Sequence, residues 1–568
     1  MESYSVPAES LKLLHEGIIQ NPLHAFLPTE IKEASKYIEF IGTDDPSIPI
    51  NWRFAESISS IKGFQASMLN VLLKKKYGVD YQRVVINTDH AQLFIMSQFL
   101  PVIDPLGEKI SPRDLEYRKY FPDGDIYKGM DGTPLIAAAT NIYKTKDGRF
   151  YHVHTSMNAG PVERALKVFP EEEKVTDFAG GCAVYQEKVS KLTAEELDTL
   201  MNDKYRQAGT ICWSTEEYLN SEHGKANAHV GLYELHHIPN PKQAPGWWTP
   251  VDGRTYPSRP LYGLKVLELA RIIAAPTVTR DLAELGASVM RITSPDVSDL
   301  TVLLCDLAWG KWNAHLDLTK PEDRSRLKAL IEESDVIVDG YRPGAMEKWG
   351  FGKNDILELF KGKERGIIYL RENCYGWNGP WAYRSGWQQI SDACCGVSLE
   401  YGRAMGNDEP VTPGFPNSDC STGVSGATAV LQALIEKSEK GGSFVIDAAL
   451  NYYSQWLVNS CSTYPSEVWK KTWASYGNPV FRNTDNMVIV TLPSYLRMLQ
   501  EHKAAVMNPD FFETRENRAL GVPVKTVKPI LTFPEGMVKP GYNIGSRGNG
   551  VDQPIWPEDL AEEVVGRY

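Results

Sequence analysis

The sequence predicts an α/β protein built on a Rossmann-like parallel sheet. Short apolar runs alternate with helical segments from residue 264 to residue 371, and the strand-like runs are rich in Val, Ile and Leu. A segment rich in proline, residues 239–250, precedes them and would sustain neither a helix nor a central strand. With 42% hydrophobic and 23% charged residues, the composition is that of an ordinary globular protein.

The predicted elements follow in order along the chain. Residues 264–270 form a first apolar strand, a helix runs from Pro276 to Leu285 and is closed by Gly286, and residues 288–292 form a second strand. A helix with an acidic first turn is expected over 321–333, followed by strands over 335–339 and 366–371. This alternation predicts a parallel sheet with helices on both faces and right-handed crossovers.

The predicted sheet lacks the loops that usually hold nucleotide phosphates. The first strand runs into Arg271-Ile-Ile-Ala-Ala-Pro276 without a Gly-x-Gly-x-x-Gly pattern, and the chain has no Gly-Lys-Ser/Thr P-loop. These absences argue against an enzyme that depends on a dinucleotide or a nucleoside triphosphate.

Length and charge limit the partners and the cellular compartments that we expect for this protein. The chain of 568 residues has room for two large domains, and its net charge of -12 argues against nucleic acid and anionic membranes as partners. No apolar run approaches the roughly 18 residues that span a bilayer. The first residues show no secretory signal, and the eight cysteines show no disulfide framework. A cytoplasmic protein is therefore expected.

The segment Pro416-Asn-Ser-Asp-Cys-Ser-Thr-Gly423 places the carboxylate of Asp419 at the mouth of a helix rich in small residues. A helix N-terminus holds an anion in its ionised form, and small side chains let another group approach the backbone closely. An ionised aspartate in that position is a candidate nucleophile. The alternative interpretation is a simple helix cap, which Asp and Ser provide in many proteins.

Several segments in the same order resemble the family III CoA-transferases, also called the CaiB/BaiF family. The matching segments cover residues 260–450 and are Leu267–Arg271, Ala274–Pro276, Leu285–Ala287, Gly310–Leu318, Tyr341–Gly344, Gly376–Trp381 and Ser418–Gly423. The resemblance implies a Rossmann-like sheet with a smaller α+β domain, and it implies that Asp419 is the acyl-accepting nucleophile. Ala275, Gly340 and Asp392 depart from residues frequent in the family, which leaves substrate choice and activity open.

The chemistry implied by the resemblance is the transfer of CoA from an acyl-CoA to a small carboxylic acid. A carboxylate attacks the thioester and forms an acyl-aspartyl anhydride, so no metal and no permanently bound cofactor is needed, and CoA itself is a substrate. Because CoA carries phosphates, we expect cations along its path. The candidates at strand ends and turns of the sheet are Arg271, Arg291, Lys311 and Arg342.

The first 250 residues are interpreted as a degenerate partial copy of the second half. Gly63–Lys74 aligns with Gly426–Lys437, and Arg83–His90 aligns with Ser443–Leu450, which sets Glu56 opposite Asp419. Residues 139–151 resemble the family's small domain, in which two strands turn on Asp-Gly. The predicted division is residues 1–250 for this copy and small domain, and 251–568 for the core and a C-terminal extension. Since the family forms interlocked dimers, either a homodimer or a pseudo-dimer within one chain is expected.

Three alternatives stay open. An α-methylacyl-CoA racemase looks similar over this region, but Trp387 stands where the racemases have a histidine. His152 and His154 could be two ligands of a metal, although no third ligand is evident and we predict no metal site. A non-catalytic CoA-binding or scaffold protein would also explain the altered family positions.

Overall fold

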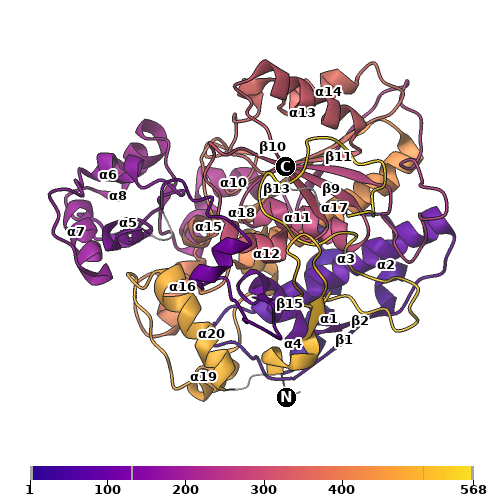
Figure 1. Cartoon of the computed structure of the whole chain (residues 1–568). Helices are drawn as coiled ribbons and strands as arrows, with labels where there is room; N and C mark the ends of the chain where they lie inside the picture. Colours follow the sequence, from indigo (N-terminus) through magenta and orange to yellow (C-terminus); the bar gives the residue numbers. More distant parts are fainter. Residues whose placement is uncertain (1–3, 129–131, 503–504, 564–568) are drawn as a thin grey trace.

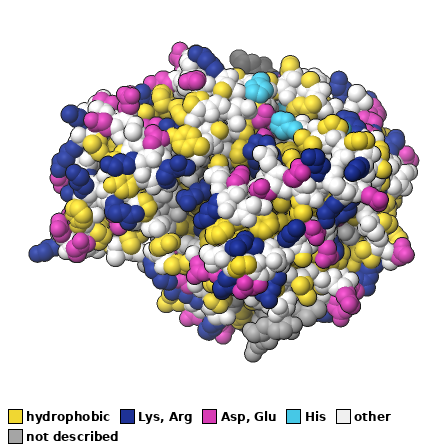
Figure 2. All heavy atoms as spheres, turned by 90° about the horizontal axis from the view of Figure 1, so that it is seen from above, with side chains coloured by type: hydrophobic (Ala, Val, Ile, Leu, Met, Phe, Trp, Pro, Cys, Tyr) yellow, Lys and Arg dark blue, Asp and Glu magenta, His cyan; other side chains and the backbone are white. Residues whose placement is uncertain are grey.

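The computed structural model describes residues 4–128, 132–502 and 505–563. A main body is built around one large sheet, and a lobe containing α5, α6, α7 and α8 stands to one side of it (Figure 1). Lys and Arg side chains are interspersed with Asp and Glu on the face seen in Figure 2. Within the described part of the chain, no helix is both long and apolar enough to cross a membrane.

The large sheet has seven strands in the order β10-β9-β8-β11-β12-β13-β7. All neighbouring strands are parallel except β7, which pairs antiparallel with β13 at one edge. The strands are β7 (Glu234–Ile238), β8 (Lys265–Leu269), β9 (Ser288–Thr293), β10 (Lys311–His315), β11 (Val336–Asp339), β12 (Ile368–Asn373) and β13 (Ser443–Ala449). The predicted α/β class with a Rossmann-like parallel sheet is confirmed.

Alternate residues of the strands enter two separate cores. Val266 and Leu370 pack on one face with α3 (Phe54–Tyr77), α11 (Ala274–Glu284) and α17 (Asn417–Lys440). Leu267 and Tyr369 pack on the other with α13 (Pro321–Glu333) and α14 (Lys353–Phe360). This alternation is the period of two that a strand imposes, and it explains why the strands read as continuous apolar runs.

The elements predicted for the core lie close to their observed bounds. The helix expected over 321–333 is α13 with the same bounds, and the expected strands are β8, β9, β11 and β12. The helix expected from Pro276 begins two residues earlier, at Ala274, so Pro276 lies in its first turn, where a missing N–H costs nothing.

The side lobe contains a three-stranded antiparallel sheet, β4-β5-β6 (Asn141–Lys144, Phe150–Val153 and Gly209–Ile211). Its helices are α5 (Pro134–Ala138), α6 (Gly160–Leu166), α7 (Phe178–Val189) and α8 (Ala194–Asp198). The β4–β5 hairpin turns at Asp147-Gly148, as predicted, and Gly148 adopts a φ of +80° that side chains disfavour. This lobe matches the smaller α+β domain expected from the sequence.

Strands from the two ends of the chain share sheets. β7 precedes residue 250 yet forms the edge of the large sheet, and β15 (Val524–Val527) of the C-terminal extension pairs with both β3 (Val102–Ile103) and β14 (Phe512–Arg515). Residues on both sides of position 250 therefore build the same sheets.

The N-terminal part contains a helix and a strand pair that closely match α17 and its neighbours. Both α3 and α17 are 24 residues long, and the residue before each has φ −76° and ψ 59°. Each helix leads into a strand that pairs in parallel with an earlier one: β2 (Val84–Asn87) with β1 (Ile38–Ile41), and β13 with β12. The two helices pack directly against each other.

Candidate active site

Asp419 is the third residue of α17, and it lies at the carboxyl-terminal edge of the large sheet. α17 runs back along the sheet and turns through Gly441 and Gly442 into β13, so its N-terminus faces the ends at which the parallel strands finish. Asp419 is partly exposed, whereas its neighbours Ser418 and Cys420 are buried. Catalytic and binding groups of open parallel sheets gather at this edge.

Asp419 does not cap the helix. The residue before α17 is Pro416, and no side chain makes a capping hydrogen bond there. Among the described residues, no hydrogen-bond or ion-pair partner of the Asp419 carboxylate is found, whereas a cap is defined by such a bond to a free N–H group. The cap interpretation of the sequence is thus wrong, and the carboxylate is left free for another partner.

The small residues of α17 serve the packing of α11. A Cβ on Gly423 would lie 2.4 Å from Cβ of Thr277, and one on Gly426 would lie 2.8 Å from Cγ2 of Val278. The group that approaches this helix backbone closely is therefore the neighbouring helix α11. The close crossing fixes the first turn of α17 against the first turn of α11.

The pKa of Asp419 is raised to about 7 by burial. The sequence suggested that the helix N-terminus would keep this carboxylate ionised, but removal from water disfavours the charged form more strongly here. A carboxyl group with a pKa near neutrality is ionised in a large fraction of molecules at pH 7 and is more basic than an ordinary aspartate.

A second carboxyl group, Glu372, lies near Asp419 and was missed by the sequence reasoning. It is the fifth residue of β12, is 8% exposed, and has a pKa raised to about 8 by burial and then by the charge of Asp419. A signal was present in the sequence, since Glu372 and Arg371 are the charged residues that follow the apolar run Ile367–Leu370.

Arg271 lies in the turn between β8 and α11. Its guanidinium carbon is 5.7 Å from the centre of the Tyr341 ring, and it donates a hydrogen bond to the carbonyl oxygen of Ser298. The next residue, Ile272, has a φ of +71°, which costs a β-branched residue free energy and is held only by its surroundings. Arg271 as a whole is half-buried.

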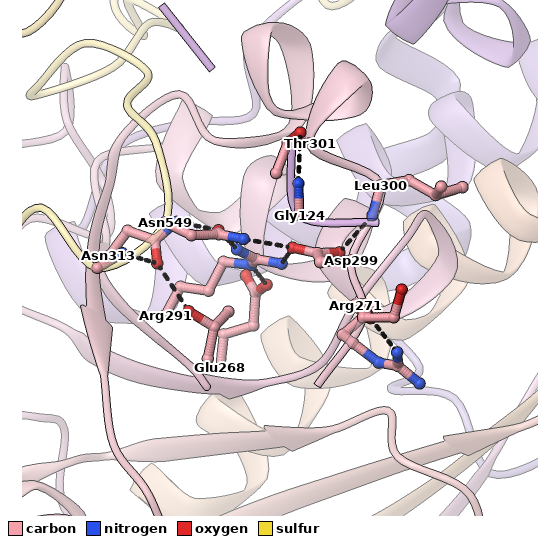
Figure 3. A network of polar contacts seen from close by, with 12 residues as sticks. Gly124, Glu268, Arg271, Arg291, Asp299, Leu300, Thr301, Asn313 and Asn549 are labelled. Atoms are coloured by element: carbon pink, nitrogen blue, oxygen red, sulfur yellow. Dashed lines mark hydrogen bonds and ion pairs between the residues drawn. The ribbon is translucent and has the colours of Figure 1, made fainter. Parts of the chain in front are cut away.

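Arg291 and Lys311 lie inside a buried ionic network. Figure 3 shows Arg291 with its partners Glu268, Asp299 and Asn549. Arg291 donates to Glu268 at 3.0 Å and to Asp299 at 2.7 Å, and Lys311 donates to Glu268 at 2.8 Å. The C-terminal extension closes the network, because Asn549 accepts from Arg291 and donates to Asp299. Both cations are almost fully buried and are neutralised by carboxylates, so the structure does not bring them to the surface with Arg271.

Arg342 is the exposed member of the predicted set. It lies in the turn after β11, and no ion pair of its side chain is found among the described residues. Arg271 and Arg342 flank Tyr341, whose ring contacts the Arg271 guanidinium, so these two cations share one rim of the sheet.

The side lobe meets the core through His154 and Trp387. Their rings stack with centres 5.3 Å apart and planes at 8°. Nδ1 of His154 accepts the N–H of Ser156 at 2.9 Å, so Nε2 carries the proton and donates to Gln389 at 2.7 Å. Both ring nitrogens are occupied, and burial lowers the pKa of His154 to about 3. This imidazole has no free lone pair with which to act as a base.

One group of side chains has the spacing of metal ligands. The ligand atoms of Glu234, His236 and Asp447 lie within 4.8 Å of one another. Arg371 already donates to both oxygens of Asp447, at 2.6 and 2.9 Å, and its positive charge opposes a cation there. His152 and His154, the pair singled out in the sequence, instead bond to a carbonyl group and to Gln389.

Comparisons with known proteins agree on one family. The family model "CoA-transferase family III" matches residues 261–487. An acetyl-coenzyme A transferase of Hypoxylon pulicicidum is 48% identical over 99% of this chain and 95% of its own length. An acyl-CoA transferase of Gibberella moniliformis is 29% identical over 89% of this chain and 88% of its own. A solved CaiB/BaiF family protein of Brucella suis is 26% identical, with a TM-score of 0.32 over 40% of this chain and 60% of its own.

Proposed function

Because this chain belongs to the family III CoA-transferases, we propose that it transfers CoA to a carboxylic acid through an anhydride formed on Asp419. The observation that carries the proposal is the position of this carboxylate. It lies in the first turn of α17 at the carboxyl ends of the strands, it is partly exposed, and it lacks a partner among the described residues.

The reaction divides into two exchanges at one carboxylate. Asp419 attacks the thioester carbonyl, the C–S bond breaks, and an acyl-aspartyl anhydride and free CoA result. The sulfur then returns to the aspartyl carbonyl and displaces the acyl group as a carboxylate, and the acceptor acid takes CoA from the enzyme thioester by the reverse steps. Each step generates an oxyanion, which backbone N–H groups near the helix ends would stabilise.

We propose that Arg271 and Arg342 contact the phosphates of CoA. Both lie on one rim of the sheet, where Arg342 is exposed and Arg271 is half-buried. In this proposal Arg291 and Lys311, which the sequence also suggested, do not contact CoA. Their network with Glu268 and Asp299 instead holds the strands β8, β9 and β10 together. The name of the Hypoxylon relative makes acetyl-CoA the first donor to test.

The proposed function is tested by incubating the protein with a panel of acyl-CoAs and mapping the mass of its peptides. We expect an acyl or CoA adduct on Asp419 and on no other carboxyl group. The exposed Asp296 serves as the matched control, because Asp296→Asn should leave both the adduct and the turnover intact. If no donor labels Asp419 and none is turned over, the chain is a CoA-binding or scaffold protein instead.

We also propose that residues 1–250 supply, within one chain, part of what a second subunit supplies to the family's dimers. The support is the match between α3 and α17, which extends to their neighbours. A parallel strand pair flanks each helix, and the second strand of each pair has an antiparallel partner on its other side: Thr532 pairs with Val85 as β7 pairs with β13. A mass measurement in solution tests whether the chain still pairs with a second copy.

A further inference from the structure

The position of Glu372 follows from the register of β12 against α17. A Cβ on Gly426 would lie 3.3 Å from Cδ1 of Leu370, so Leu370 faces α17. Two residues further along the strand, Glu372 is on the same face. Two strand residues advance about 6.6 Å, which equals about four residues of helix at 1.5 Å each. Since the helix runs against the strand, Glu372 lies level with Thr422, within one turn of Asp419.

The residues beside Glu372 on this face are small. Its partner on β13 is Ala448, and on the other side lies Gly340, where an added Cβ would come within 3.8 Å of Oε2 of Glu372. The same Cβ would meet Ala270 and Ala275 at 3.0 and 2.5 Å. The Glu372 carboxyl group is thus the polar group that this cross-strand row presents beneath the first turns of α11 and α17.

Glu372 has no hydrogen-bond or ion-pair partner within the described ranges, although it is 8% exposed. A buried carboxyl group without a partner carries a large cost, and most proteins avoid it or supply a cation. The nearby charged groups here are carboxyls: Asp419 from α17 and Asp339 from β11, the latter bonded to the hydroxyl of Tyr369 at 2.8 Å. An unpaired group of this kind points to a ligand that completes it.

We propose that Glu372 is a catalytic residue that gives its proton to the CoA sulfur when Asp419 is acylated, and takes it back when the sulfur returns. This inference rests on the acyl-aspartyl route proposed above. It assigns to Glu372 a role that Asp419, as the nucleophile, cannot fill.

The proposed step balances in atoms and charge. An oxygen of Asp419 forms a bond to the acyl carbon, the C–S bond breaks with its electron pair on sulfur, and the O–H proton of Glu372 passes to that sulfur. The site begins with ionised Asp419 and neutral Glu372, and it ends with a neutral anhydride, ionised Glu372 and CoA thiol. Asp419, Glu372 and the sulfur carry one negative charge between them throughout, so Asp419 and Glu372 are never ionised together.

Acylation itself prepares the proton transfer. In the free enzyme the charge of Asp419 helps to raise the pKa of Glu372 to about 8, so Glu372 carries its proton at neutral pH. Once Asp419 becomes an uncharged anhydride, that repulsion is gone and Glu372 becomes a stronger acid. This happens as the thiolate leaves, whose conjugate thiol has an ordinary pKa of about 8.5. The reverse exchange restores both the charge and the proton.

The test is the variant Glu372→Gln, which keeps the size of the side chain and removes the transferable proton. We expect kcat with acetyl-CoA to fall by about 10²- to 10⁴-fold, which is what proton transfer by a positioned side chain contributes. Asp419 should still become labelled, but more slowly. The loss should shrink with an acyl thioester whose thiol is more acidic, because that leaving group needs no proton.

The pH profile separates this role from a structural one. For the unaltered enzyme, kcat/KM should rise as Asp419 ionises near pH 7 and fall as Glu372 loses its proton near pH 8, with apparent values that belong to the coupled pair. Glu372→Gln should lose the alkaline fall. Asp335→Asn is the matched control, because Asp335 also has a raised pKa but lies at the opposite end of β11. Its profile should be unchanged.

Unchanged kcat and an unchanged alkaline limb in a folded Glu372→Gln protein would overturn the assignment while leaving Asp419 as the nucleophile. Thermal melting confirms that the variant folds, and Glu372→Asp, which keeps the proton, should recover part of the activity. Absence of any label on Asp419 in the unaltered enzyme would instead remove the proposed function on which this inference rests.

Discussion

At the residue scale, the sequence predicted that Asp419 lies at the start of a helix, but it did not predict which groups surround the carboxylate. The run Ser418–Gly423 and the order of the other segments predicted a carboxylate at a helix start. The raised pKa, the missing capping bond and the neighbouring Glu372 depend on strands that are far away in sequence. Arg291 and Lys311 show the same limit, since only their tertiary partners Glu268 and Asp299 reveal that they are buried pairs.

Asp419→Asn should abolish transfer and at the same time stabilise the protein above neutral pH. An amide cannot form the anhydride. The folded-state pKa of about 7 lies above the unfolded value near 4, so ionisation favours unfolding progressively from pH 4 to pH 7, and the whole cost is present above that. Melting curves should show little difference between variant and parent at pH 4 and a higher Tm of the variant at pH 8. Equal Tm values at pH 8 would mean that the carboxylate is well solvated.

Arg342→Gln should change substrate binding, whereas Arg291→Met should change the stability of the fold. Loss of the exposed Arg342 should raise KM for acyl-CoA several-fold, more at low salt than at high salt, and leave Tm unchanged. Loss of Arg291 leaves Glu268 with Lys311 as its remaining cation and takes from Asp299 the guanidinium that neutralises it. Breaking a buried pair in this way costs about 3–5 kcal/mol and should lower Tm strongly. Steady-state kinetics and melting measure both. A wild-type KM for Arg342→Gln would remove Arg342 from the CoA path.

At the element scale, the regular alternation of the core made strands and helices predictable within a few residues, as α13 and β11 show. The alignment of residues 63–74 with residues 426–437 sets Gly63 opposite Gly426, and these glycines occupy the same position in α3 and α17. That residues 1–250 are a partial copy stays a prediction. The sequence could not supply the edge strand β7, none of whose residues is buried. It also could not supply the contacts of α3 with residues that follow β13. Ser57 of α3, for example, bonds Tyr453, which follows β13.

Glu56 is the third residue of α3, as Asp419 is of α17, but the Glu56 carboxylate is fully buried and hydrogen-bonded. The hydroxyls of Tyr4 and Tyr464 donate to its two oxygens at 2.5 and 3.0 Å, and Arg53 lies 3.9 Å away. Glu56→Gln should therefore leave kcat and KM within twofold, with no label on this residue in the parent protein. If Glu56→Gln is inactive and Asp419→Asn is not, the two helices have exchanged roles and the division proposed for the chain is wrong.

At the scale of the whole molecule, the N-terminal part contributes strands and a helix to the core and is not an appended domain. It supplies β7 to the large sheet, α3 to the face of α17, and β3 to the sheet formed by the C-terminal extension. The C-terminal extension also contacts the N-terminal part through the antiparallel pairing of Thr532 with Val85. From length we predicted two large domains. Contacts between segments that are distant in the sequence leave no local pattern from which they could have been predicted.

A chain shortened to residues 251–568 should therefore not fold into an active protein. Removing α3 would uncover the surface of α17 that packs against it, and removing β7 would leave β13 as an unpaired edge. We expect the shortened chain to aggregate or to melt without a cooperative transition, whereas the full chain should unfold cooperatively. Circular dichroism, light scattering and the transfer assay check this. A soluble, active dimer of the shortened chain would show that residues 1–250 are dispensable, and the interpretation of α3 as a substitute for a second subunit would have to be abandoned.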